Sequence, residues 1–223
     1  MIKRTKKSFV DEYIVSNNLK VLDIGCGYSA HKAANTICDI QDFSKHYKEK
    51  NFVKLESDTL PFKDKEFDFV IASHVLEHVK NPEIFLRELE RVSKEGYIEV
   101  PTKLEDNLVF ENKKAHLWQL EFDDINNRLL IIKKNQIIEP FLSVASVNNL
   151  RRYFEDSLII QLFWKEKIDF QLDKTGFNQN QKISRLGLVN KFFSKDSFKE
   201  KAENQKVLEN TSILSIFLCI YVQ

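Results

Sequence analysis

The sequence predicts an α/β fold built on a doubly wound, mostly parallel sheet. Short apolar segments alternate with helical or polar connections from the start of the chain to about residue 101. Residues 67–72 are uniformly apolar after Asp68, which is typical of a central parallel strand that is buried on both faces. A glycine turn at 25–27 directly follows the apolar segment 20–24. Open α/β sheets bind ligands beyond the carboxyl ends of their strands, so this turn marks the first candidate site.

The first expected element is a helix with Phe9, Tyr13 and Ile14 on its apolar face. It ends at the asparagine pair 17–18. The basic residues around its start are expected on the solvated face of this helix: Lys3, Arg4, Lys6 and Lys7.

The other elements of the first half are short strands and one long helix. Pro82 favours the start of that helix, an apolar stripe continues to Val92, and Gly96 is expected to end it. The expected strands are 20–24, 35–40, 52–55, 67–72 and 97–100.

The second half is less regular. We expect one domain in all, with a cofactor-binding core at 20–101, a substrate-side insertion at 102–155 and a C-terminal part at 156–223. The expected elements are an irregular segment 102–127, a hairpin of 129–132 with 137–138, a helix at 147–154, a long strand at 157–172, a polar loop at 173–193, a helix at 197–208 and a last strand at 213–222.

Composition excludes several classes of protein. The net charge of +1 argues against a nucleic-acid-binding surface. Three scattered cysteines are too few for a disulfide framework or a zinc site. No apolar segment resembles a signal peptide, and 213–222 is too short to span a bilayer. We therefore expect a cytoplasmic protein without a membrane span.

The motif VLDIGCG at 21–27 carries the richest chemical signal. Glycines after a buried strand let the backbone turn sharply and approach a ligand closely. With Ala30 the motif also fits the loose G-x-G-x-x-G/A fingerprint, so a nicotinamide-dependent dehydrogenase is an alternative. Asp23 is placed to face a cationic group, and Asp39 ends the second strand, where a carboxylate can bind both ribose hydroxyls.

Five motifs in order resemble one family. VLDIGCG is followed by DTLPF, FDFV, SHVLEHV and GYIEVP, and this series over residues 20–101 is similar to the class I S-adenosylmethionine-dependent methyltransferases of the type 11-like family. The resemblance implies a Rossmann-like sheet of about seven strands with a reversed last strand. It also implies S-adenosylmethionine as the cofactor and no required metal.

The resemblance also implies roles for individual residues. Asp39 would bind the ribose, with Asp42 as an alternative because the crossover at 28–35 is short. Ser73 and His74 would both lie near the sulfonium and the incoming acceptor. The remaining cofactor contacts would be Asp23, Gly25 and Gly27 at the methionine end, and Asp58 and Leu60 at the adenine.

Transfer of the methyl group needs in-line positioning, and a base only where the acceptor loses a proton. His74 and His116 are the candidate bases, and Trp118 is a candidate platform for the acceptor. The aromatic ring beside the acidic residues Glu121, Asp123 and Asp124 suits a hydroxyl-rich ligand. We therefore expect O-methylation of a sugar or glycan precursor, or of a small molecule.

Three further alternatives remain. The acceptor is aromatic or lipid-like, or the chain is a non-catalytic cofactor-binding module that serves a partner. The pattern H-x-x-E-H formed by His74, Glu77 and His78 also matches a zinc-protease signature, although the methyltransferase motifs account for the same segment.

Overall fold

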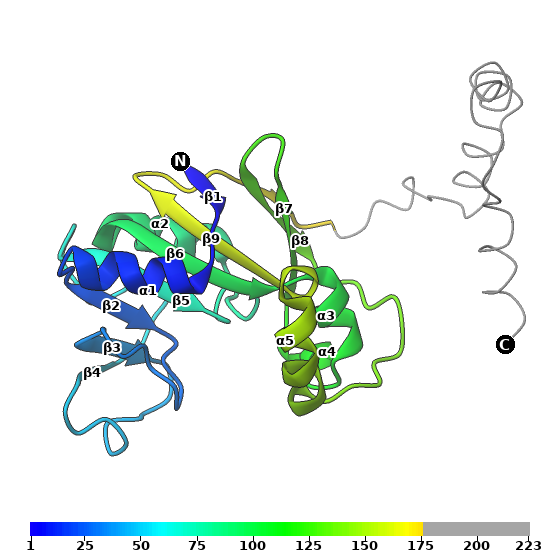
Figure 1. Ribbon diagram of the computed structural model, residues 1–223, viewed down its shortest axis with the longest axis horizontal. Coiled ribbons are helices and arrows are strands. Elements are labelled where there is room, and N and C mark those ends of the chain that lie inside the picture. The colour runs from blue at the N-terminus through cyan, green and yellow to red at the C-terminus, as the bar shows by residue number, and fades with distance from the viewer. Residues whose placement is uncertain (176–223) are drawn as a thin grey trace, which may run out of the picture. The chain divides into compact units, whose positions relative to one another are not determined.

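The computed structural model of the protein describes residues 1–175, and their main feature is a seven-stranded sheet (Figure 1). Strand β9 pairs antiparallel with both of its neighbours, β6 and β1, so it alone runs against the other six. This confirms the predicted mostly parallel α/β sheet with one reversed strand. In spatial order the strands are β4 (Asn51–Lys54), β3 (Thr36–Asp39), β2 (Val21–Ile24), β5 (Phe67–Ser73), β6 (Ser93–Pro101), β9 (Ile159–Lys165) and β1 (Ile2–Arg4).

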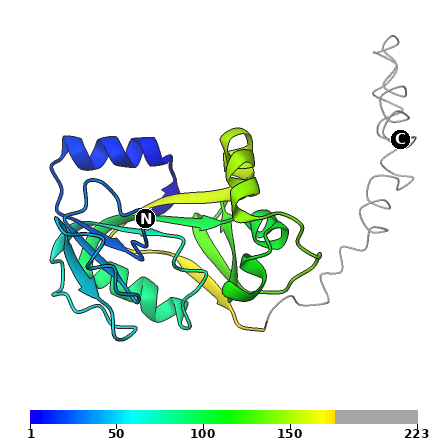
Figure 2. The same ribbon diagram turned by 90° about the horizontal axis from the view of Figure 1, so that it is seen from below.

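Two helices cover opposite faces of this sheet (Figure 2). Helix α1 (Lys7–Ser16) buries Val10 and Ile14 against one face. Helix α2 (Pro82–Val92) begins with the Asn81 cap and packs its apolar stripe on the other face. The sheet residues alternate between these two cores, as the pleat of a strand requires.

The remaining elements form a smaller layer that follows β6 in the chain. Its three-stranded sheet has the order β10-β8-β7, with β7 and β8 antiparallel and β10 parallel to β8. Figure 1 places it beside three helices near the carboxyl end of β6. These elements are α3 (Lys103–Leu108), α4 (Asn112–Ala115), β7 (Trp118–Asp123), β8 (Arg128–Lys133), α5 (Val144–Leu158) and β10 (Phe170–Asp173).

The prediction for the N-terminal basic run was wrong in part. Lys3 and Arg4 belong to strand β1 and not to a helix, and they pair with Phe163 and Leu162 of β9. A strand of three residues is too short to show a period, and its partner lies about 160 residues away in the sequence. Local patterns therefore gave no signal for it.

The predicted hairpin also paired the wrong segments. Strand β8 pairs with β7, which lies inside the segment expected to be irregular, and residues 137–138 form no strand. Buried Gln119 and half-buried Glu121 interrupt the apolar pattern of β7 and hide it. The observed turn is held by Asp123, whose Oδ1 accepts hydrogen bonds from the backbone of Ile125 and Asn126.

The expected long strand at 157–172 is three elements. Helix α5 continues to Leu158, β9 ends at Lys165, and β10 belongs to the smaller sheet. Glu166 has a φ of 63°, and this left-handed turn breaks an alternation that looks continuous in sequence. The predicted helix 197–208 and strand 213–222 lie outside the described residues. Within residues 1–175, no helix is both long and apolar enough to cross a bilayer.

Gly96 does not end a helix as predicted, because α2 stops at Val92 and Gly96 lies within β6. The reason for glycine here is close packing. A Cβ at position 96 would overlap the Val70 carbonyl oxygen and lie 2.8 Å from Val70 Cγ1 and 2.9 Å from Trp164 Nε1.

We predict that Gly96→Ala lowers the free energy of unfolding by about 1–3 kcal/mol, the usual cost of overpacking a well-packed core. Urea denaturation of the purified variant measures this. Lys94→Ala, an exposed position on the same strand, is the matched control and should change stability by less than about 0.5 kcal/mol. Equal stability of Gly96→Ala and the wild type would contradict the packing described here.

Candidate functional site

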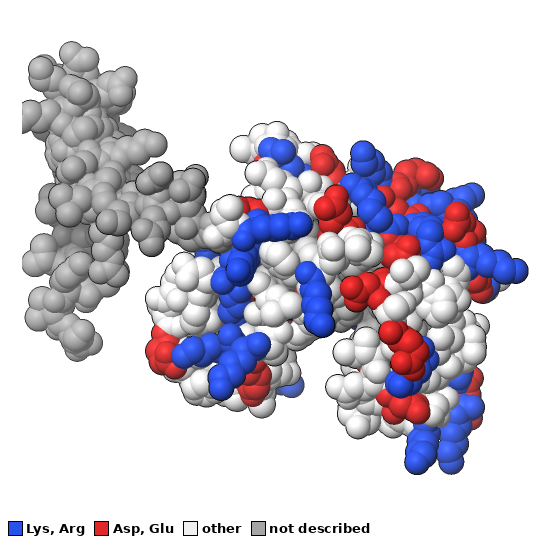
Figure 3. Space-filling view, turned by 180° about the vertical axis from the view of Figure 1, so that it is seen from behind, with Lys and Arg blue, Asp and Glu red and all other residues white. Residues whose placement is uncertain are grey.

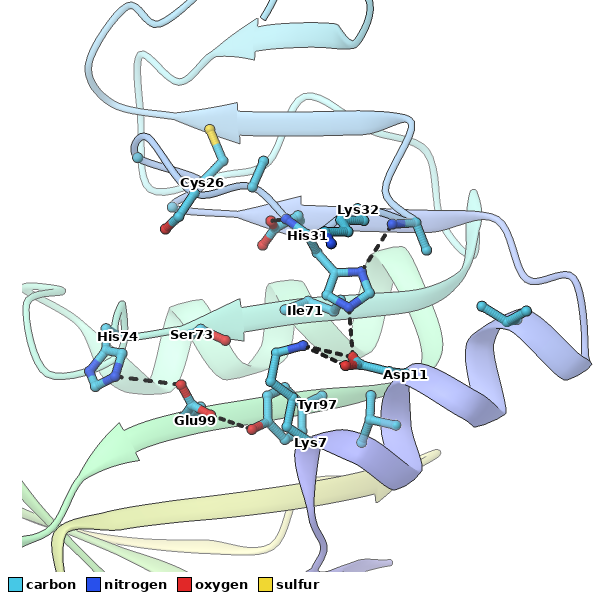
Figure 4. A pocket seen from close by; sticks show the side chains of 18 residues that line it. Lys7, Asp11, Cys26, His31, Lys32, Ile71, Ser73, His74, Tyr97 and Glu99 are labelled. Carbon is cyan, nitrogen blue, oxygen red and sulfur yellow. Dashed lines mark hydrogen bonds and ion pairs between the residues drawn. The ribbon is translucent and has the colours of Figure 1, made fainter. Parts of the chain in front are cut away.

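A cavity of about 970 Å³ lies at the carboxyl ends of β2 and β5 (Figure 4). The strand order reverses between these two strands, and open α/β sheets bind ligands at such a switch point. The volume is at the upper end of the range for small-molecule sites. Its polar and glycine lining includes Lys7, Asp11, Asp23, Gly25, Gly27, His31, Ser73, His74, Tyr97 and Glu99.

The glycine turn after β2 presents bare backbone to this cavity. Gly25 and Gly27 have φ values of 69° and 47°, a region that side chains rarely allow. A Cβ at Gly25 would overlap the Val75 side chain, whereas a Cβ at Gly27 would meet nothing within 4 Å. Gly25 thus permits close packing, and Gly27 leaves open space for a ligand.

Asp39 holds the turn from the end of β3. Its Oδ2 accepts a hydrogen bond of 3.0 Å from the Gly27 backbone, and its Oδ1 accepts one of 2.9 Å from Gln41. Asp42 lies in the following turn, is exposed, and accepts from the Ser44 backbone. Of the two candidate ribose ligands, Asp39 is the one attached to the glycine turn.

Asp23 is a buried carboxylate beneath the same turn. Its Oδ2 accepts a hydrogen bond of 2.7 Å from the backbone of His31. Burial raises the pKa of Asp23 to about 6, although the His31 hydrogen bond opposes that rise. A carboxylate in this state gains from a nearby cation, which would replace part of the lost solvation.

Helix α1 supplies a part of the cavity wall that the sequence did not predict. Asp11 accepts from Lys7 Nζ at 2.7 Å and contacts His31 Nε2 at 2.8 Å (Figure 4). The resemblance covered only residues 20–101, and the helix period of α1 indicated packing alone. Nothing in the sequence connected it with the glycine turn.

His74 follows β5 with a φ of 55°, a strained conformation for a residue with a side chain. Its Nδ1 lies 3.2 Å from Glu77 Oε1, and its Nε2 lies 3.5 Å from Glu99 Oε1. Burial alone would lower the pKa of His74. The hydrogen bond to Glu77 and the charges of Glu77 and Glu99 outweigh burial and raise the pKa above its ordinary 6.5.

The pair Tyr97 and Glu99 was also missed. The Tyr97 hydroxyl donates to Glu99 Oε2, and both side chains face the cavity beside His74 (Figure 4). Residues two apart on a strand share a face, so the spacing in GYIEVP carried this signal.

His116 and Trp118 are placed away from the cavity lining. His116 is buried, and its Nδ1 lies 2.6 Å from Asp106 Oδ1. Trp118 is 8% exposed, packs in the main core, and donates from Nε1 to the Val79 carbonyl at 2.8 Å. Both residues are packed in the interior, and their proposed roles in binding or deprotonating an acceptor stay predictions.

The residues predicted for the adenine follow β4 and are also not part of this cavity lining. Asp58 is exposed, whereas Leu60 is buried in the main core and its backbone N–H donates to Glu88.

The acidic residues of the insertion have partners of their own. Glu121 lies 3.6 Å from Lys103, Asp123 accepts the turn hydrogen bonds, and Asp124 pairs with Arg4. Acidic and basic side chains are interspersed on the face shown in Figure 3.

A buried ionic network fixes helix α3. Asp106 is 1% exposed and contacts both His116 and Lys134, whose Nζ lies 2.9 Å from Asp106 Oδ1. Glu105 is buried beside it and accepts from Arg151 Nε at 2.7 Å. The partners lie up to 46 residues apart, so no local pattern identified them.

We predict that Asp106→Ala lowers the free energy of unfolding by about 3–5 kcal/mol, because Lys134 and His116 then lose their buried partner. Chemical denaturation measures the change. The exposed pair is the control, and Asp124→Ala should cost less than about 1 kcal/mol. A similar small cost for both variants would show that the buried network does not stabilise the fold.

Comparison with known proteins gives a match within the same part of the chain. The sequence model of a family described as a methyltransferase domain matches residues 22–98. An uncharacterized protein of Methanocaldococcus jannaschii is 37% identical over 81 residues, which are 34% of this chain. The match spans about two fifths of that relative, 40% of its length.

Solved structures show a more distant similarity. A methyltransferase of Thermotoga maritima, described as a possible histamine N-methyltransferase, is 17% identical, with a TM-score of 0.39 over 70% of this chain and 88% of its own. One of Archaeoglobus fulgidus is 18% identical, with a TM-score of 0.40 over 72% and 94%. The similarity therefore lies in the matched segment: residues 22–98 match the methyltransferase domain family that the type 11-like motifs predicted.

Proposed function

We propose that this protein is an S-adenosylmethionine-dependent methyltransferase that methylates a hydroxyl oxygen of a small acceptor, with sugars and glycan precursors as the first class to test. The observation that carries the proposal is His74. It lines the cavity beside the glycine turn, and Glu77 holds its Nδ1. Its Nε2 is buried 3.5 Å from Glu99 Oε1 and makes no hydrogen bond among the described residues, so it is the ring nitrogen left to accept a proton.

The residues around the glycine turn fit the cofactor. Gly27 leaves open space above its backbone, and Asp23 is a buried carboxylate suited to a cationic group. In the proposal Asp23, Gly25 and Gly27 bind the methionine end, and Asp39 binds the ribose hydroxyls. Ser73 borders the sulfonium, and Asp58 with Leu60 lies toward the adenine.

S-adenosylmethionine, when bound, would supply a methyl group activated by a positively charged sulfur; the methyl carbon would bond to the acceptor oxygen, and the sulfur would be released as a thioether. The protein positions the acceptor in line and takes up the hydroxyl proton. His74 Nε2 accepts that proton, while Glu77 orients the ring and stabilises the imidazolium formed. Glu99, held by Tyr97, faces the same nitrogen and adds to this stabilisation.

Of the two candidate bases, the geometry favours His74 over His116. His116 is buried and already bonded to Asp106, and it is not part of the cavity lining. The acidic residues near Trp118 contact other parts of the chain, so they do not support a sugar acceptor. The carboxylate of Glu99, which lines the cavity beside His74, supports a hydroxyl-bearing acceptor.

We predict that Asp39→Ala weakens S-adenosylmethionine binding by about 30- to 150-fold, the cost of a lost charge-assisted contact to two hydroxyls. Calorimetry of the binding measures it. Asp42→Ala is the matched control and should bind within about threefold of the wild type. The opposite order of the two variants would move the ribose contact to Asp42.

We predict that His74→Ala lowers kcat by about 10²- to 10⁴-fold on the preferred acceptor while cofactor affinity changes little. The wild-type rate should rise with pH, because only neutral His74 accepts a proton. The midpoint of that rise should lie above 6.5, since the pKa of His74 is raised. His74→Ala should lose this rise.

A panel of nucleotide-sugars, glycans and small phenols with labelled cofactor tests the acceptor class. His116→Asn serves as the control for the base and should keep most of the activity. Turnover of the phenols alone would remove the sugar proposal, and full activity of His74→Ala would remove the base assignment. Cofactor binding without turnover on any acceptor would favour a non-catalytic module.

A further inference from the structure

Three side chains outside the cavity lining converge next to it. Glu77 and His78 follow β5, and His116 precedes β7. One ligand-type atom from each lies within 4.8 Å of the others. The two segments are joined by their backbones, since Leu117 and Trp118 both donate to the Glu77 carbonyl, at 2.8 Å and 3.3 Å.

The two histidines use the same ring nitrogen, Nδ1, in their hydrogen bonds. His78 Nδ1 lies 3.0 Å from the Ala115 carbonyl, and His116 Nδ1 lies 2.6 Å from Asp106 Oδ1. A carbonyl or a carboxylate accepts, so Nδ1 carries a hydrogen in each ring, and Nε2 is the nitrogen with the lone pair when the ring binds a metal. Histidines that bind metals have this arrangement, with the second ring nitrogen bonded to a carboxylate or a carbonyl.

Glu77 provides an independent observation. Its side chain is fully buried, and Oε1 is used by His74. Its Oε2 has no hydrogen-bond partner among the described residues. A buried carboxylate oxygen without a partner is costly, and a cation would satisfy it.

The charges around the cluster also favour a cation. The buried carboxylate of Glu77 belongs to the cluster. The buried carboxylate of Asp106 contacts His116 and pairs with Lys134. His78 is exposed at one side, so an ion has access from solvent. The cluster thus combines a ligand set, an unsatisfied charge and an entry path.

We propose that Glu77, His78 and His116 bind one divalent transition-metal ion, zinc in the first instance, through one carboxylate oxygen and two imidazole nitrogens. A set of two histidines and one glutamate is a known ligand type for zinc and leaves a fourth position for water or another oxygen ligand. The set differs from the H-x-x-E-H pattern because His74 is the hydrogen-bond partner of Glu77 and not a ligand. The ion would clamp the loop after β5 to the start of β7.

Titration of the untagged full chain with Co²⁺, after removal of metals by a chelator, tests the site. Visible absorption should saturate at one equivalent with the strong bands of low-coordinate cobalt, and added Zn²⁺ should displace them. His78→Ala and Glu77→Gln should weaken binding by about 100-fold or more. Asp106→Asn, which weakens the support of His116 and also the ion pair with Lys134, should weaken it by about 10- to 100-fold.

The controls separate this site from adventitious binding. His46→Ala removes an exposed histidine elsewhere and should bind like the wild type, as should His74→Ala. Saturating Zn²⁺ should raise the Tm of the wild type but not that of His78→Ala. Because His78 is exposed, its replacement should leave the fold intact, so misfolding would not explain a lost Zn²⁺ effect. Unchanged binding in His78→Ala, no binding near one equivalent, or loss of binding in His74→Ala would overturn the assignment.

Discussion

The reversal of strand order between β2 and β5 is the constraint on which the site depends. The chain leaves β2 toward β3 and leaves β5 toward β6, in opposite directions along the sheet, so the ends of the two strands are not covered by a direct connection. Both ends adopt left-handed backbone there, at Gly25 and at His74. One strand end therefore offers bare backbone, and the other offers an ionisable side chain over the same cavity.

Glu77 connects the cavity with the smaller layer of the structure. Its carboxylate orients His74, and its carbonyl accepts hydrogen bonds from the backbone N–H groups of Leu117 and Trp118. The helix α3 network then holds His116 against the same loop through Asp106. A buried ion pair of this kind adds little stability over apolar packing, yet it fixes the position of each member once formed. The insertion thus holds the loop that positions the proposed base His74, although His116 and Trp118 do not line the cavity.

The features that the sequence predicted well are those set by neighbouring residues. The strands 20–24, 67–72 and 97–100, the glycine turn and the Pro82 helix each come from a local pattern, and all are present. Two of the omissions came from contacts between distant segments, since strand β1 pairs with β9 and Asp11 of α1 contacts His31. Strand β7 was missed for a local reason, because Gln119 and Glu121 interrupt its apolar pattern. A single sequence gives no signal for contacts between distant residues, because each partner alone is compatible with a surface position.

We infer that the switch point between β2 and β5 holds the cofactor with its sulfur toward His74. A crystal structure of the protein with S-adenosylhomocysteine tests this placement. We expect the amino-acid end along Gly25 and Gly27, the ribose hydroxyls on Asp39, and the sulfur bordered by Ser73 and His74. A product molecule bound away from the glycine turn, or one whose sulfur faces His116 instead of His74, would contradict it.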